Sequence, residues 1–214
     1  MRCLTFVFLF VTATSIKAQE NLVSNSDFEN YTSEQIRKHG LLTIYFNQSN
    51  WKSFGSIDLF SRLNETLPCN QFGKACPISG SAYMGMNAAY PREIAQTQLK
   101  KPLEKDKIYC ISFYISISNK TDTAVKLRVL FSDTLVINFS GFVFFPKTIA
   151  LSECEEAMDN WKKVYVLYKA SGVENYLSIG NFDDENDPVI SSKHQWHDSY
   201  YFVDDVMLKE LSNS

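Results

Sequence analysis

Carboxylates that could bind a cation gather in two segments at opposite ends of the chain. Asp27 and Glu29 belong to the first segment, and Asp204 and Asp205 belong to the second. Calcium prefers hard oxygen ligands, and backbone carbonyls can complete its shell of about six to eight oxygens. If adjacent strands bring the segments together, Glu29 and Asp204 are the first candidates, and at most one of Asp204 and Asp205 faces the ion because side chains alternate along a strand. The alternative is that these carboxylates cap strand ends or pair with Lys and Arg.

Aromatic and hydrogen-bonding side chains elsewhere in the chain are typical of a sugar site. Sugars present flat C–H faces that stack on Trp and Tyr, while their hydroxyl groups bond to polar side chains. The alternative for Tyr83 and the pair Tyr200 and Tyr201 is that they belong to the hydrophobic core. The candidate ligand-binding residues are Tyr83, Asn87, Tyr90, Arg92, Trp196 and Tyr200.

The remaining reactive residues form no recognised catalytic pattern. Neither G-x-S-x-G nor H-E-x-x-H occurs, and the sequence has no glycine-rich phosphate loop. His194 and His197 lie beside Asp198, but zinc catalysis needs a third ligand, and His39 is the only other histidine. The acidic run 183–187 lacks the glycine and the distant glutamate of an EF-hand and is interpreted as a solvated turn. The sequence therefore predicts a protein that is not an enzyme.

Four cysteines follow the first eighteen residues, and an even number favours disulfides in an exported chain. Cys69 and Cys76 enclose a loop marked by proline and glycine, so they are expected to form a local disulfide. Cys110 and Cys154 then form a second bridge or remain buried thiols, and both alternatives stay open. A zinc site is the competing interpretation, but the paired C-x-x-C spacing of zinc knuckles is missing.

The first eighteen residues indicate export. Met1 and Arg2 make a positive start, residues 4–11 are apolar, and Ala18 is a small residue suited to signal peptidase. Residues 1–18 are therefore predicted to be a cleaved signal peptide. No later run approaches about 18 apolar residues, so no membrane span is expected.

Composition excludes several classes of protein. The chain has 214 residues, of which 45% are hydrophobic and 21% charged, as in a globular protein rather than a disordered one. Its 21 Lys and Arg against 24 Asp and Glu give a net charge of −3, which provides no basic surface for nucleic acid or an anionic membrane. Because no linker or repeat divides residues 19–214, they are expected to form a single domain.

Strand-like runs dominate the rest of the chain. Large apolar residues alternate partly with small polar ones in residues 108–118, which is the period of a half-buried strand. Only residues 32–38 and 153–158 are helix-like. The number and spacing of the strands predict an all-β sandwich of about eight or more strands. Further strands are predicted at residues 125–131, 134–139, 161–168, 176–180 and 200–208.

Motifs at the two ends of the chain resemble those of a known family. Residues 21–29 read N-L-V-S-N-S-D-F-E, and residues 200–208 read Y-Y-F-V-D-D-V-M-L. This pairing resembles the galactose-binding-like jelly roll of carbohydrate-binding modules. More narrowly, it is similar to domains of secreted and outer-membrane proteins from gliding, polysaccharide-degrading bacteria, where the domain often lies N-terminal to a peptidoglycan-binding module of the OmpA type.

The resemblance continues between the two ends, in the family's order. Residues 92–96, R-E-I-A-Q, are similar to the family's R-E-Y-I-Q but have Ala95 at the fourth position. The resemblance implies a jelly-roll β-sandwich with the first and last segments side by side, and a structural calcium ion at their carboxylates. The other similar segments are 51–60 (W…G-x-x-D-x-F), 80–85 (G-x-A-Y-x-G), 109–118 (Y-x-V-S-F-Y-V-S) and 175–182 (Y-L-T-I-G-N-F).

Two functions from different classes follow from these features. The first is a non-catalytic module, exported to the periplasm, the outer cell surface or the extracellular space, that recognises an envelope or extracellular glycan through exposed aromatic residues. The second is a protein-interaction module of an envelope, secretion or gliding assembly, whose partner is an envelope protein. In either case we expect a monomer without a nucleic-acid partner.

Overall fold

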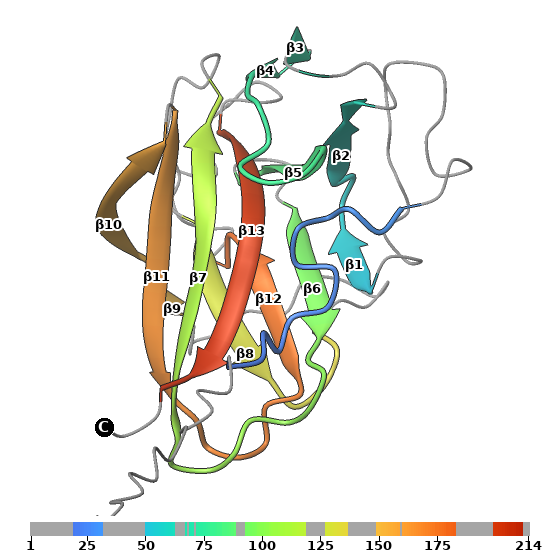
Figure 1. Ribbon diagram of the computed structural model, residues 1–214. Helices are drawn as coiled ribbons and strands as arrows, with labels where there is room; N and C mark the ends of the chain where they lie inside the picture. Colours follow the sequence, from blue (N-terminus) through green and yellow to red (C-terminus); the bar gives the residue numbers. More distant parts are fainter. Residues whose placement is uncertain are drawn as a thin grey trace, which may run out of the picture.

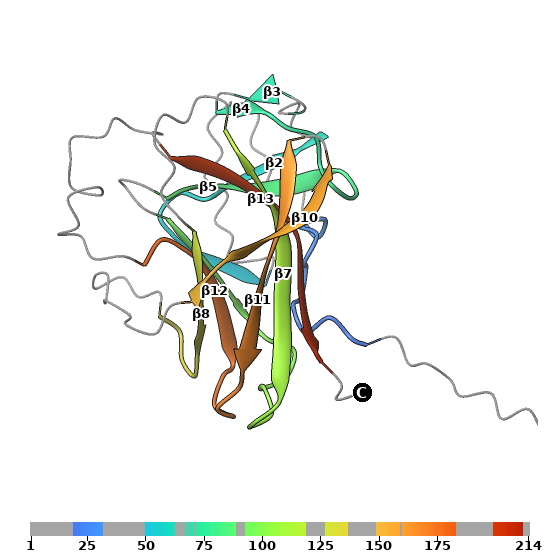
Figure 2. The same ribbon diagram turned by 90° about the vertical axis from the view of Figure 1, so that its left-hand side faces the viewer.

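Two antiparallel β-sheets pack face to face and form the expected jelly-roll β-sandwich (Figures 1 and 2). The predicted signal peptide and the helix-like residues 32–38 lie outside the described residues. For residues 154–158 only the backbone is described. The computed structural model describes residues 19–31, 50–62, 67, 69–70, 72–88, 93–118, 127–136, 149–158, 160–182 and 199–211.

The larger sheet has six strands in the order β10-β11-β7-β13-β5-β2. Its central strand β7 follows the alternation of its sequence, because Tyr109, Ile111 and Phe113 are buried against the other sheet. The strands predicted at 108–118, 161–168 and 200–208 are confirmed in this sheet. Its members are β2 (Asp58–Ser61), β5 (Ala82–Asn87), β7 (Ile108–Ile117), β10 (Ser152–Met158), β11 (Trp161–Lys169) and β13 (Tyr200–Glu210).

The second large sheet has five strands in the order β1-β6-β12-β8-β9. They are β1 (Trp51–Phe54), β6 (Ile94–Gln98), β8 (Arg128–Ser132), β9 (Ile149–Ala150) and β12 (Tyr176–Gly180). A hairpin of β3 (Cys69–Asn70) and β4 (Gly73–Lys74) forms a separate two-stranded sheet. This hairpin lies at the top of both views, and the chain that follows it runs along the outer side of the six-stranded sheet to β5 (Figures 1 and 2).

Two predictions about secondary structure are wrong. The helix predicted at residues 153–158 is strand β10, which pairs with β11. Its glutamates favour a helix locally, but hydrogen bonding to a neighbouring strand outweighs this weak propensity. Residues 134–136 of the strand predicted at 134–139 form no strand, and Ser132 Oγ donates to the carbonyl oxygen of Thr134 at 2.8 Å. Residues 137–139 lie outside the described residues. No helix among the described residues is long and apolar enough to cross a membrane.

The N-terminal segment joins the sandwich along β13, as predicted. The N–H of Leu22 donates to the carbonyl oxygen of Leu208 at 2.9 Å. The Asn21 side chain adds two bonds at 2.9 Å, since it donates to the carbonyl oxygen of Val206 and accepts from the N–H of Leu208. The first and last segments of the domain therefore lie side by side.

The same segment also closes one edge of the hydrophobic core. Trp51 of β1 is fully buried, and its ring centroid lies 5.5 Å from that of Phe28. The indole N–H of Trp51 donates to the carbonyl oxygen of Asn25 at 3.0 Å, so this buried polar group has a partner. The N-terminal segment thus connects β1 of one sheet with β13 of the other.

Candidate ligand-binding face

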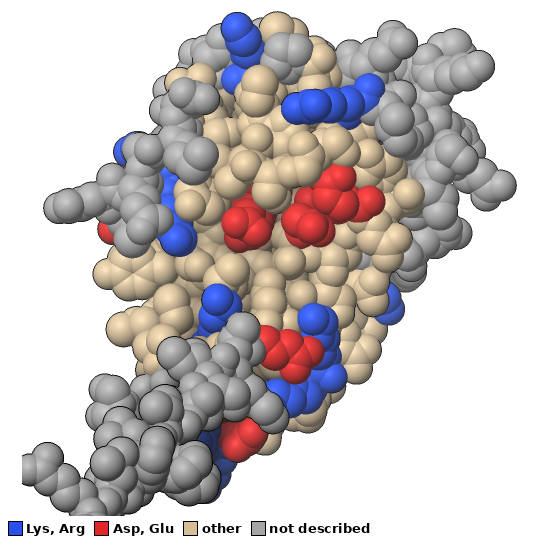
Figure 3. Space-filling model, in the orientation of Figure 1, with Lys and Arg blue, Asp and Glu red and all other residues tan. Residues whose placement is uncertain are grey.

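Aromatic side chains line the outer face of the six-stranded sheet, which points away from the inter-sheet core. Along β13, Tyr201 and Val203 point into that core, so Tyr200 and Phe202 point outward. The outer face of an antiparallel sheet is usually polar, which makes this lining unusual. Figure 3 views this side and shows a largely uncharged surface with a small acidic group near its middle. The same alternation directs outward Phe60 of β2, Tyr83 of β5, Tyr114 of β7, and Trp161 and Tyr165 of β11.

One part of this face is buried, and we term it the covered cluster. Within it, the rings of strand residues meet at angles from 40° between Phe60 and Tyr83 to 85° between Phe60 and Phe202. The ring of Phe72, from the hairpin, instead lies flat on Tyr200. The covered cluster consists of the strand residues Phe60, Tyr83, Trp161, Tyr200 and Phe202, and the Phe72 ring of the hairpin packs on it.

Gly85 of β5 provides the space that the covered cluster needs. A Cβ atom at this position would lie 2.3 Å from Cε2 of Phe60 and 2.5 Å from the hydroxyl oxygen of Tyr200. We therefore expect Gly85→Ala to lower the free energy of unfolding by about 1–3 kcal/mol, because two buried rings must move. Urea denaturation measures this loss, and an unchanged transition would contradict the tight packing.

The cover segment, defined as the described residues of 69–80, buries this cluster. The indole N–H of Trp161 donates to the carbonyl oxygen of Cys76 at 2.8 Å, and the amide of Asn70 donates to the hydroxyl of Tyr83 at 3.3 Å. The cover segment therefore contacts the cluster through polar bonds as well as through the ring of Phe72.

Beside the cluster, a partly exposed region carries two tyrosines on neighbouring strands. Tyr114 of β7 lies opposite Lys163 of β11, and Tyr165 of β11 lies opposite Ser112 of β7, so the tyrosines are diagonal neighbours. Such positions lie about 7–8 Å apart on a sheet. The Lys163 amine is 5.6 Å from the centroid of the Tyr114 ring. These four residues, all half-buried, are termed the open strip.

Three of the predicted sugar-binding residues lie on this outer face, but all three are buried. Tyr83 and Tyr200 are 0% and 2% exposed, and Asn87, opposite Tyr200 in the sheet, is 4% exposed. In this structure these three residues therefore form no exposed sugar site, because the cover segment lies over both tyrosines, and their role in sugar binding stays a prediction. The other candidates, Tyr90, Arg92 and Trp196, lie outside the described residues.

Glu29, the first calcium candidate, binds the turn before β5. Its Oε1 accepts from the N–H of Ser81 at 2.6 Å and from the N–H of Ala82 at 2.7 Å, and the Ser81 hydroxyl donates to Oε2 at 2.6 Å. A Cβ atom at Gly80 would lie 2.4 Å from Oε1, and Gly80 has a φ of +59°. Glycine therefore suits this position both for its conformation and for the close approach of the carboxylate.

Asp204, the second candidate, binds the same turn from β13. It is fully buried, and its Oδ2 accepts from the N–H of Ile78 at 2.8 Å while its Oδ1 accepts from the N–H of Asp205 at 2.7 Å. N–H groups direct their positive ends toward a carboxylate and take the positions that a cation would need. In this structure both carboxylates therefore bond to backbone N–H groups, and calcium binding by Glu29 and Asp204 stays a prediction.

The other two calcium candidates have a different setting. Asp205 has a φ of 52° where the pairing of β13 with β7 is irregular, so simple alternation does not apply there. Asp27 Oδ1 accepts from the N–H of Glu29 at 3.4 Å. In the part of the chain that the structure describes, no three His, Cys, Asp or Glu side chains are placed to share a metal ion. Calcium binding by Asp27 and Asp205 stays a prediction.

The predicted disulfide between Cys69 and Cys76 is not formed, since both residues are free and exposed cysteines. In the hairpin register Cys69 lies opposite Lys74, which places Cys76 two positions beyond its cross-strand partner. Cys110 is also a free thiol, and the side chain of Cys154 lies outside the described part.

Two aspartates of the outer face have raised pKa values. Removal from water raises the pKa of Asp58 to about 7, although the Tyr200 hydroxyl, which donates to its Oδ2 at 2.5 Å, opposes part of the rise. Removal from water likewise raises the pKa of Asp204 to about 7, against the effect of its backbone N–H donors. Both groups are therefore more readily protonated in the folded chain than in the unfolded chain.

Stability is accordingly expected to fall as the pH rises from about 4 to about 7. In this window the folded protein keeps protons on Asp58 and Asp204 that the unfolded chain has released, so a higher pH favours unfolding. Each raised pKa contributes a loss of about 3 kcal/mol in this window, so the combined loss is on the order of 6 kcal/mol. Urea denaturation at pH 4.5 and pH 7.5 measures the difference, and Asp58→Asn should reduce it. A wild-type protein that is more stable at pH 7.5 would contradict these assignments.

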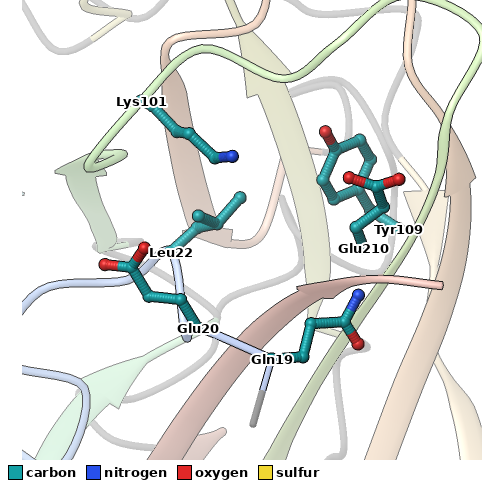
Figure 4. A pocket seen from close by; sticks show the side chains of 6 residues that line it. All are labelled: Gln19, Glu20, Leu22, Lys101, Tyr109 and Glu210. Carbon is teal, nitrogen blue, oxygen red and sulfur yellow. The ribbon is translucent and has the colours of Figure 1, made fainter. Parts of the chain in front are cut away.

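A small pocket (Figure 4) includes Glu210 at the end of β13, whereas the covered cluster includes Tyr200 at the start of that strand. Its glutamates are engaged in ion pairs, Glu210 with Lys107 at 3.0 Å and Glu20 with Lys100 at 3.7 Å. Its one aromatic residue, Tyr109, is fully buried and offers no ring face to a sugar. We therefore place the candidate site on the open strip. The pocket is lined by Gln19, Glu20, Leu22, Lys101, Tyr109 and Glu210.

No protein-family model matches the chain, and no curated protein matches its sequence. Similar solved structures include the tandem CBM22-1–CBM22-2 domain of Xyn10C from Paenibacillus barcinonensis, with 15% identity, coverage of 94% of this chain and 49% of that one, and a TM-score of 0.49. A putative sugar-binding protein from Bacteroides thetaiotaomicron is 13% identical, with coverage of 90% of this chain and 100% of that one and a TM-score of 0.45. The CBM22-1–GH10 modules of xylanase 10B from Clostridium thermocellum, complexed with xylohexaose, are 16% identical, with coverage of 77% of this chain and 27% of that one and a TM-score of 0.43. The chain thus spans about half of the first structure and about a quarter of the third.

Proposed function

We propose that the protein is an exported, non-catalytic carbohydrate-binding module that binds a glycan chain on the open strip. The two half-buried tyrosines on neighbouring strands, Tyr114 and Tyr165, carry this proposal. Their rings can stack against the flat C–H faces of sugar units, while Lys163 and Ser112 can bond to the hydroxyl groups. The fold alone would not suffice, because one fold hosts many functions.

The arrangement of the open strip favours an oligosaccharide over a monosaccharide. A single ring contact at an interface contributes a few kcal/mol at most, so a ligand that reaches both tyrosines gains considerably over one that reaches a single ring. The partly covered sheet surface also offers contact on one side only, which suits a chain that lies along it. We therefore infer an extended glycan as the ligand class.

The carboxylate nearest to the open strip in the sheet register, Asp204, favours binding without catalysis. Glycoside hydrolysis needs two carboxylic acids on either side of the scissile bond. Asp204 lies opposite Tyr114 in the sheet, but its oxygens accept backbone N–H bonds. We infer that the protein holds glycans without cleaving them. The predicted signal peptide, residues 1–18, would place this activity in the periplasm, on the outer cell surface or outside the cell.

A glycan array followed by isothermal titration calorimetry tests the proposed function. Xylohexaose is included among the probes because one of the similar structures contains it. We expect saturable binding of at least one oligosaccharide by the purified protein. An array without saturable binding would contradict the proposal and favour the protein-interaction alternative.

A further inference from the structure

The Phe72 ring lies on the outer face of the sheet, against the flat side of the Tyr200 ring. The ring lies flat on Tyr200, with the centroids 3.9 Å apart and an angle of 2° between the planes. Tyr200 meets its strand neighbours Phe202 and Phe60 at 67° and 69°. Aromatic pairs generally prefer edge or offset contacts to a flat sandwich, whereas a sugar ring packs flat on a tyrosine. The Phe72 ring therefore occupies the face of Tyr200 that would suit a sugar.

The polar bonds around Phe72 follow the same pattern. Two side chains of the covered cluster, and that of Ser118 directly after β7, donate hydrogen bonds to backbone carbonyl oxygens of the cover segment. Oxygen atoms of a sugar could accept the same bonds if the segment moved away. The three donor side chains and their acceptors are Tyr83 to Ala75 at 3.2 Å, Trp161 to Cys76 at 2.8 Å, and Ser118 to Phe72.

The hairpin receives little support from strand pairing. Its strands share only the pairs Cys69 with Lys74 and Asn70 with Gly73, and they join neither large sheet. An isolated two-stranded hairpin is marginally stable in water. The base of the cover segment is held more firmly, because Glu29 and Asp204 bind the turn before β5. The hairpin can therefore open about this base while the sandwich stays intact.

The covered cluster is continuous with the open strip. Tyr114, one of the two tyrosines of the strip, also packs against the buried rings of the covered cluster. Opening the hairpin would therefore lengthen the exposed aromatic surface from Tyr165 and Tyr114 onto Tyr200.

We propose that Tyr200 is a second sugar-stacking position of this face and that the cover segment occupies it as an internal competitor, with Phe72 in place of the sugar ring. This proposal rests on the proposed carbohydrate-binding function. A ligand long enough to extend beyond the open strip displaces the hairpin and stacks on Tyr200. Its apparent affinity is reduced by the small fraction of molecules in which the hairpin is open, and removal of the competitor restores that affinity.

The test is calorimetry of Phe72→Ala with xylohexaose and with the hexasaccharide that binds best on the array. We expect binding to become about tenfold tighter than in the wild type, because more molecules have the Tyr200 face free. Disaccharides, which are too short to reach beyond the open strip, should bind both proteins alike. Lys74→Ala, an exposed change in the same hairpin, is the matched control and should bind as the wild type does.

A second variant and a second measurement keep the test independent of folding defects in Phe72→Ala. Asn70 Oδ1 accepts from the N–H groups of Phe72 and Gly73 at 2.8 and 3.1 Å, so Asn70→Ala loosens the hairpin without removing any aromatic side chain. This variant should also bind hexasaccharides more tightly. In the wild type, hydrogen exchange in residues 69–80 should become faster when hexasaccharide binds.

The outcomes separate the two proposals. Unchanged hexasaccharide affinity in both variants, with unchanged hydrogen exchange on binding, overturns the competitor role and leaves the proposed function standing. Failure of the wild type and of both variants to bind any oligosaccharide overturns both proposals. Binding by the variants where the wild type shows none would support both.

Discussion

Replacing Glu29 with alanine is expected to lower the free energy of unfolding by about 2–4 kcal/mol. The side chain accepts bonds from the N–H groups of Ser81 and Ala82 and from the Ser81 hydroxyl. Its removal leaves two backbone donors without their partner and frees the turn before β5, which also forms the base of the cover segment. Urea denaturation measures the loss, provided that the variant and the wild type have the same m-value.

Glu29→Gln distinguishes this role from calcium binding. The amide oxygen of glutamine can accept both N–H bonds, and its NH₂ group can donate to the Ser81 hydroxyl, so we expect a loss of at most about 1 kcal/mol. Both variants should behave the same in calcium and in chelator. If Gln were as harmful as Ala, and only when calcium is present, Glu29 would be a metal ligand.

The second large effect concerns binding. We expect Tyr165→Ala to weaken binding of the array's best oligosaccharide by about 10- to 100-fold, which corresponds to about 1.4–2.8 kcal/mol. The half-buried ring of Tyr165 provides one of the two stacking surfaces of the open strip, and its loss leaves a single ring for the ligand. Tyr114→Ala should have a similar effect, measured by the same calorimetric titration.

Tyr176→Ala is the matched control for these variants. Tyr176 is also a half-buried tyrosine in a strand, and its neighbours Leu177 and Ile179 point into the core, so Tyr176 lies on the outer face of the other sheet. Its replacement should change the affinity less than about twofold. Equal losses for Tyr165→Ala and Tyr176→Ala would show that the open strip is not the binding surface.

The alternation of residues predicts the strands well where the strand is long and half-buried. Strand β7 shows this, because Tyr109, Ile111 and Phe113 share the core face that their spacing predicts. Strand β10 shows the limit, since its glutamates favour a helix and only its pairing with β11 makes it a strand. Pairing between distant segments is a tertiary property that local propensity does not contain.

The candidate site could be predicted only in part for the same reason. The juxtaposition of Glu29 and Asp204 is predicted, but their partners are backbone N–H groups, which no side-chain pattern reveals. Tyr83 and Tyr200, two of the predicted sugar-binding residues, lie on one face of the sheet, yet the cover segment over them is recognisable in sequence only as a loop. Tyr165 stands at an outward position of a predicted strand, and the cross-strand register that sets it diagonally from a second tyrosine becomes visible only in the assembled sheet.

A chemical-shift titration of the isotope-labelled protein with the array's best oligosaccharide tests the central claim most directly. If the open strip is the glycan-binding surface, the largest amide shifts should fall in β7 and β11, around Ser112, Tyr114, Lys163 and Tyr165, and should saturate with the affinity found by calorimetry. Saturating shifts confined to the five-stranded sheet, or to the pocket around Lys101, would contradict the claim.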